Sequence, residues 1–113
     1  MMKPELEEIV RQADKLLQVK KSELLPGDEL VLKTRNSFYT VEVESDGRYR
    51  VSGGWFDKTE LSPHRTTING CTWGGSAIKT DIVAAIGLFV EFGDRLLTSR
   101  VQQIVHIPRS IKN

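Results

Sequence analysis

Residues 38–53 read FYTVEVESDGRYRVSG, and this stretch decides the fold. Apolar and polar side chains alternate through 38–44 and again through 48–53, which is typical of strands with one buried and one solvent-facing side. The short polar segment between the two runs is suited to a tight connection. The stretch therefore predicts an antiparallel β-hairpin.

The register of this hairpin follows from its loop. A two-residue turn at Asp46-Gly47 would place Arg50 opposite Val43 and bury a charge beside a valine. A three-residue loop, 45–47, pairs Val43 with Tyr49 instead and puts glycine in the last position, which favours a left-handed backbone. The same loop gives three further cross-strand pairs: Val41 with Val51, Glu44 with Arg48, and Glu42 with Arg50.

Further strands are predicted before and after the hairpin. Runs of strand-forming residues occupy 29–35, 66–73 and 96–107. Residues 57–65 are polar and predict a surface loop. Short breaks or turns are expected at 36–37 and 93–95.

The apolar run 82–92 fits a buried helix or a buried strand, because periodicity cannot separate the two. Gly87 and the residues after it favour a strand that is bent at this glycine.

Residues 4–21 predict an amphipathic helix. Their apolar residues recur at helical spacing, at Leu6, Ile9, Val10, Ala13, Leu16 and Leu17. Pro4 suits the first helical position, and glutamates in the first turn and lysines in the last match the helix dipole. The turn signals of 24–28 end the helix, and its apolar stripe is expected to pack on the β part.

These patterns combine into one expected architecture. The chain, 1–113, is interpreted as a single domain of the α+β class that is mainly β. It consists of the N-terminal amphipathic helix followed by a small antiparallel β-barrel or rolled sheet of five to six strands. The β part covers 28–108, and 109–113 form a short tail.

Composition narrows the classes of function. Sixteen basic residues against fifteen acidic ones give a net charge of +1, which argues against a broad polyanion-binding surface. The lone Cys71 excludes an internal disulfide. We recognise no signal peptide, and the run 82–92 is too short to cross a bilayer, so we expect a cytoplasmic protein without a membrane partner.

Two short motifs are mirror images of each other. Residues 52–55 read SGGW, and residues 73–76 read WGGS. Glycine allows tight corners and close backbone approach, whereas tryptophan supplies a large apolar ring. The motifs predict two corners of one barrel, each anchored by a tryptophan.

No catalytic or metal-binding constellation emerges from the motifs. Residues 70–76 lack the lysine that a phosphate-binding Walker loop requires. Ser76 and Lys79 match the Ser-x-x-Lys pattern of serine acyl-enzymes, but the companion motifs are missing. Cys71 could pair with His64 or His106, although no spacing ties them together or gives a metal site. We therefore expect no catalytic residue, metal or cofactor.

The sequence favours a non-catalytic binding or interaction module with an unidentified protein or nucleic-acid partner. Its candidate ligand-binding residues are Trp55, Phe56, Trp73, Gly74, Gly75, Ser76, Lys79 and Arg65. One alternative is a small β-barrel that binds single-stranded RNA or DNA through exposed aromatic rings and arginines. Another is a small enzyme that uses Cys71 or Ser76. Exposure of the aromatic rings discriminates between a core role and a binding role.

Overall fold

The computed structural model describes residues 17–74, 77–93 and 96–112. In these residues the chain is mainly β, as predicted. The ten described strands form three antiparallel sheets rather than a closed barrel, so the expected barrel of five to six strands is corrected.

The largest sheet has five strands in the order β10-β2-β3-β4-β5. The strands are β2 (Glu29–Thr34), β3 (Phe38–Val43), β4 (Tyr49–Gly53), β5 (His64–Thr66) and β10 (Val101–Ile107). The edge strands β10 and β5 do not pair with each other, and the sheet therefore stays open.

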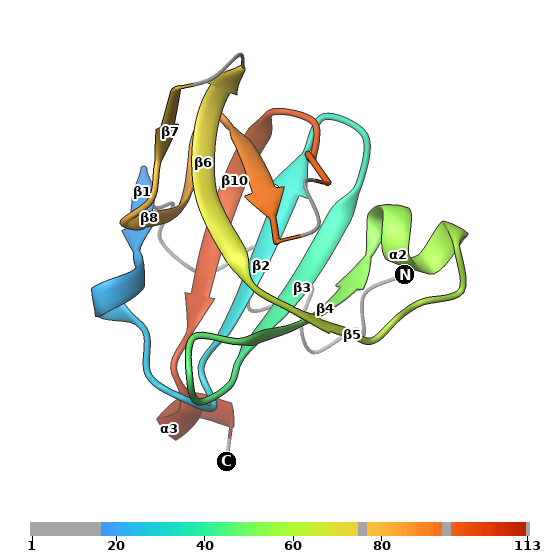
Figure 1. Cartoon of the computed structure of the whole chain (residues 1–113). Helices are drawn as coiled ribbons and strands as arrows, with labels where there is room; N and C mark the ends of the chain where they lie inside the picture. Colours follow the sequence, from blue (N-terminus) through green and yellow to red (C-terminus); the bar gives the residue numbers. More distant parts are fainter. Residues whose placement is uncertain (1–16, 75–76, 94–95, 113) are drawn as a thin grey trace.

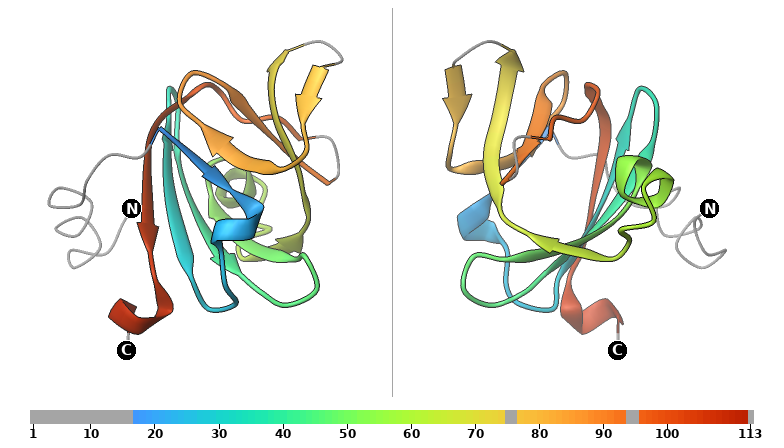
Figure 2. Two further views of the ribbon diagram at one scale, coloured as in Figure 1. Left: turned by 90° about the vertical axis from the view of Figure 1, so that its left-hand side faces the viewer. Right: turned by 45° about the vertical axis from the view of Figure 1, so that its right-hand side comes forward.

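Two smaller sheets lie against the large one (Figures 1 and 2). The order β7-β6-β9 joins β7 (Ala77–Lys79), β6 (Ile68–Gly74) and β9 (Phe89–Phe92). The other pairs β1 (Gln18–Lys20) with β8 (Ile82–Ala85). Figure 2 shows β6 and β7 on one side of the molecule and β10, β2 and β3 on the other. The core is formed between these layers.

The central hairpin has the predicted register. Val43 pairs with Tyr49 and Val41 pairs with Val51. The Glu44 N–H donates to the Arg48 carbonyl at 2.9 Å, which closes the three-residue loop, and Gly47 has a φ of +71°. One detail differs, because the Glu44 carboxylate forms its ion pairs with Arg50 and Arg65.

The main core is built from the inward-facing residues of both layers and of a short helix, α2 (Gly54–Lys58). Leu30, Leu32, Val41, Phe92 and Ile104 are all fully buried there. A smaller cluster joins Cys71 to Ile82, Ala85 and Leu88. Burial of this many apolar side chains is the main source of stability.

The predicted helix at 4–21 is wrong at its C-terminal end. Residues Gln18–Lys20 form β1, which pairs with β8, and Lys21–Glu23 form a single 3-10 turn. Val19, outside the apolar helical stripe, is the residue that β1 buries, whereas Leu17 is 80% exposed. The hydrogen-bonded ladder to β8 thus overrides the local helical signal. Residues 4–16 lie outside the described part of the chain.

The run 82–92 is extended, as favoured, and consists of β8 and β9 joined by a turn at Gly87, whose φ is +86°. The predicted loop 57–65 is wrong at its ends, because α2 includes residues 57–58 and β5 begins at His64. The strand predicted from 96 begins only at Val101, and α3 (Arg109–Lys112) replaces most of the tail. None of the described helices is long and apolar enough to cross a membrane.

Candidate functional site

The first Gly-Gly pair forms the corner between β4 and α2. Gly53 and Gly54 have φ values of +96° and +46°. A Cβ on Gly53 would lie 2.2 Å from the Phe38 carbonyl oxygen, and one on Gly54 would lie 2.3 Å from the Tyr39 ring. Glycine is required here because the end of β4 and the start of α2 both lie so close to β3.

The aromatic residues that follow this corner have different environments. Phe56 is fully buried and contacts the rings of Tyr39 and Phe92 at centroid distances of 6.2 and 5.3 Å. The structure therefore places Phe56 in the core, where it cannot stack on a ligand. Trp55 is 39% exposed, and its ring lies edge-on to Phe56. The anchor of this corner is the phenylalanine rather than the tryptophan.

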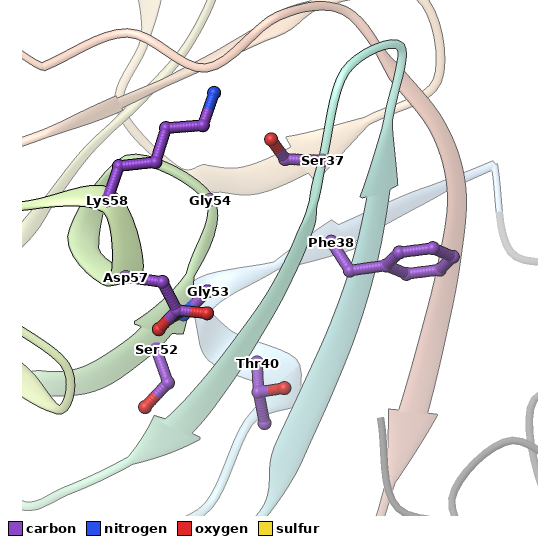
Figure 3. A pocket seen from close by; sticks show the side chains of 8 residues that line it. All are labelled: Ser37, Phe38, Thr40, Ser52, Gly53, Gly54, Asp57 and Lys58. Carbon is purple, nitrogen blue, oxygen red and sulfur yellow. Dashed lines mark hydrogen bonds between the residues drawn. The ribbon is translucent and has the colours of Figure 1, made fainter. Parts of the chain in front are cut away.

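A groove of about 380 Å³ lies beside the same corner (Figure 3). It is lined by Ser37, Phe38, Thr40, Ser52, Gly53, Gly54, Asp57 and Lys58. Asp57 Oδ1 accepts a hydrogen bond from the Gly53 N–H at 3.1 Å. The Phe38 ring points away from the other labelled side chains in Figure 3. The groove is consequently lined by hydroxyl groups and by one charged residue of each sign.

The second motif carries the more exposed tryptophan. Trp73 is 53% exposed near the end of β6, and the Lys79 ammonium lies 5.1 Å from its ring centroid. This is a cation–π contact across the pair β6 and β7. The structure thus brings together two of the predicted site residues, Trp73 and Lys79. Gly74 has a φ of +112°, while Gly75 and Ser76 lie outside the described residues.

A second cation–aromatic pair lies at the same end of this sheet. The Arg100 guanidinium carbon is 4.7 Å from the Phe89 ring centroid, and Arg100 Nη1 donates to the Gly87 carbonyl at 2.8 Å. Phe89 pairs with Thr72 across β9 and β6, and its ring edge is 3.8 Å from the position of a Cβ on Gly74. We call Trp73 and Lys79 the Trp73 surface.

Among the described residues, no ion pair involves Lys79, the cation of the Trp73 surface. The ion pairs of the described residues lie elsewhere and join Glu44 to Arg50 and Arg65, and Asp28 to His106. On β9, the Glu91 carboxylate accepts a hydrogen bond from the Asn69 side-chain amide at 2.8 Å. The Arg35 N–H donates to the Arg100 carbonyl at 3.0 Å, and both residues are exposed.

The remaining predicted site residues lie elsewhere. Arg65 is on β5, where its guanidinium donates to Glu44 at 2.6 and 3.3 Å and lowers the pKa of that carboxyl group. Trp55 is on α2, which lies on the opposite side of Figure 1 from β7. The two tryptophans therefore do not form one binding surface.

Cys71, His64 and His106, which were considered for catalysis, are buried or in contact with other side chains. Cys71 is fully buried, and burial raises the pKa of its thiol, which disfavours the reactive thiolate. His64 stacks on Phe56, and His106 Nε2 lies 2.8 Å from Asp28 Oδ2. In the described part of the chain, no group of three or more histidine, cysteine and acidic residues could hold a metal ion.

Sequence reasoning missed Phe89 and Arg100. Phe89 belongs to a continuous apolar run, and Arg100 lies just before a strand, so neither has a local signal of function. Their proximity arises only when β9 pairs with β6 and residue 100 returns beside Gly87.

No family model matches the chain, and comparisons with curated proteins and with solved structures also give no match.

Proposed function

We propose that this chain is a non-catalytic binding module that holds an anionic partner at the Trp73 surface. The observation that carries the proposal is the half-exposed Trp73 ring with the Lys79 ammonium 5.1 Å from its centroid. An exposed aromatic ring beside a lysine that forms no ion pair with the other described residues offers apolar contact and charge attraction to the same partner.

The surroundings of Cys71, the candidate nucleophile among the described residues, support a binding role rather than an enzymatic one. The buried thiol of Cys71 lies in an apolar cluster with Ile82 and Leu88, without a described imidazole partner. The His106 ring is engaged with Asp28, and the His64 ring packs on the core. A thiol-dependent reaction would need a base within reach of Cys71.

The proposal is tested by NMR titration of ¹⁵N-labelled protein with two anionic probes, poly-L-glutamate and a twelve-residue oligouridylate. We expect at least one probe to shift the Trp73 indole and the Lys79 amide at low ionic strength, and Lys79→Gln to weaken that binding. Shifts that occur only around Arg48 and Arg65, or no shifts with either probe, would contradict the proposal.

A second candidate function is favoured by the groove between β3, β4 and α2. Its hydroxyl groups, together with the opposite charges of Asp57 and Lys58, suit a small neutral ligand with several hydroxyl groups. Glucose and glycerol are suitable probes. Shifts at the Ser52 and Asp57 amides that disappear in Ser52→Ala would support this function, and unchanged spectra up to high millimolar concentrations would reject it.

A further inference from the structure

We infer that residues 4–16 cover the outer face of the five-stranded sheet, over β10 and β2, with their apolar stripe. The outer face is the side of this sheet that points away from the main core. Two valines on this face, Val31 and Val105, carry the inference, because they are only 2% and 1% exposed. The outer face is distinct from the Trp73 surface, so the inference and the proposed function can fail separately.

The register of the strands places both valines on the outer face. Leu30 and Leu32, on either side of Val31 in β2, point into the main core. Because side chains alternate along a strand, Val31 points the other way. Val105 on β10 and Thr40 on β3 are the cross-strand partners of Val31, so the three residues share the outer face.

The two valines are buried although they belong neither to the main core nor to the smaller cluster around Cys71. A valine on an uncovered sheet face keeps much of its side chain in contact with water. Among the described elements, both smaller sheets lie on the opposite side of β10 and β2, α2 packs beside β4, and α3 follows the end of β10 (Figures 1 and 2). The described elements thus leave the cover of Val31 and Val105 to other residues of the chain.

The N-terminal segment joins the described structure beside the edge of this sheet. The Leu17 carbonyl accepts a hydrogen bond from the Ile86 N–H at 2.9 Å, and the next residue, Gly87, donates to the Val101 carbonyl at 2.8 Å. Leu17 therefore lies close to the start of β10, which is an edge strand. Val105 is about 13 Å farther along β10. A segment of 4–16 with helical spacing would span about 20 Å, which is enough to reach both valines.

The sequence of this segment is suited to an apolar sheet face. Its apolar residues recur at helical spacing and form one stripe: Leu6, Ile9, Val10, Ala13 and Leu16. The other residues of 5–15 are charged or glutamine and would face water. Such a stripe needs an apolar surface to cover it, and Val31 and Val105 provide one. A second copy of the protein is not needed as the cover, because both valines are buried within a single chain.

The covered area adjoins the groove between β3, β4 and α2. Thr40, the partner of Val31, lines this groove together with Phe38 and Ser52 (Figure 3). A segment that covers Val31 would therefore border the groove and restrict the size of a ligand there.

A nitroxide label on the polar side of the segment tests this placement in the full chain. Glu8→Cys supplies the attachment site, since the native Cys71 is fully buried. We expect the label to broaden the amide signals of Val31 and Val105 more than the signal of Lys79, which lies on β7 in the opposite layer. Equal broadening of the three signals, no broadening, or stronger broadening at Lys79 would overturn the inference.

A mixed sample distinguishes the segment of the same chain from that of a second copy. It contains ¹⁵N-labelled protein without the nitroxide and unlabelled protein with it. We expect the Val31 and Val105 signals to stay sharp in this sample, because the cover comes from the same chain. If both signals are broadened as much as in the singly labelled protein, a second copy covers the face and the inference is wrong.

Ile9→Ser and Glu8→Ser form a matched pair of variants, because the two residues are neighbours and only Ile9 belongs to the stripe. Ile9→Ser should lower the Tm by at least about 4 °C, since its side chain no longer packs on the sheet, and should shift the Val31 and Val105 amide signals. Glu8→Ser should lower the Tm by less than about 2 °C. Equal Tm values for the two variants, or shifts confined to the smaller sheets, would contradict the inferred cover.

Discussion

At the scale of single residues, the glycines at the two ends of β4 have unequal roles. Gly47 occupies the left-handed position of the hairpin loop, with no atom within 4 Å of where a Cβ would lie. Gly53 combines a φ of +96° with a contact to the Phe38 carbonyl that leaves no room for a side chain. Backbone conformation constrains both positions, but packing constrains only the second.

We therefore expect Gly53→Ala to destabilise the protein more than Gly47→Ala. Gly47→Ala should lower the free energy of unfolding by about 1 kcal/mol, the usual cost of a left-handed backbone at a non-glycine residue. Gly53→Ala should cost at least about 3 kcal/mol, because β3 and β4 must also separate at this point. Urea denaturation measures both values. Equal effects would show that the contact to Phe38 relaxes without cost.

Asp28 is a buried carboxylate that connects three segments. It is 4% exposed and accepts hydrogen bonds from the Leu25 N–H, the Arg109 N–H and His106 at 3.1, 3.0 and 2.8 Å. Burial acts to raise the pKa of Asp28, but the hydrogen bonds from Arg109, His106 and Leu25 outweigh it, and the pKa is lowered. The ionised form thus stabilises the fold.

Stability should therefore fall when Asp28 is protonated. Because its folded pKa is lowered, its contribution is complete above the unfolded value of about 3.9 and is lost as the pH falls through the folded pKa. We expect Asp28→Asn to cost about 2 kcal/mol at pH 7, and this difference from wild type to shrink below pH 4. Urea denaturation between pH 2.5 and 7 measures it. A pH-independent difference would contradict the role of the charge.

At the scale of elements, β1 shows how a distant partner determines local structure. Residues 17–20 continue the helical pattern of the sequence, yet they bury Val19 against β8 instead. The partner is more than sixty residues away, so no local window contains it.

Two alanine variants test this assignment. Val19→Ala should cost about 1–2.5 kcal/mol, since Val19 is 2% exposed in the core. Leu17→Ala should change stability by less than about 0.5 kcal/mol, since Leu17 is exposed. Thermal denaturation of both variants suffices. If Leu17→Ala destabilised the protein more than Val19→Ala, the result would favour the predicted helix through residue 17 instead.

The elements that could be predicted are those with short-range signals. The hairpin register followed from the charge and apolar pairs around one loop, and the bend of 82–92 followed from Gly87. The helix α2 could not be predicted, because its five residues are set by the packing of Phe56 between Tyr39 and Phe92. For the same reason, the contact between Phe89 and Arg100 could not be predicted, and the role of Trp73 and Lys79 in binding stays a prediction.

At the scale of the whole molecule, the open arrangement of sheets leaves a small apolar cluster around Cys71 between β6, β8 and the turn before β9. Cys71 therefore reports on the separation of these sheets. We expect an Ellman reagent to modify the native thiol at least about 100-fold more slowly than the thiol of protein unfolded in urea. Rapid modification of the native protein would instead reopen the thiol-enzyme alternative.

The position of Lys79 has one more consequence. It lies on β7, a three-residue strand at the edge of its sheet. Short edge strands that carry a lysine resist the addition of a strand from another molecule, since the charge would have to be buried in the new interface. The ammonium group beside Trp73 thus also protects this edge against aggregation, and replacing it with an apolar side chain would remove that protection.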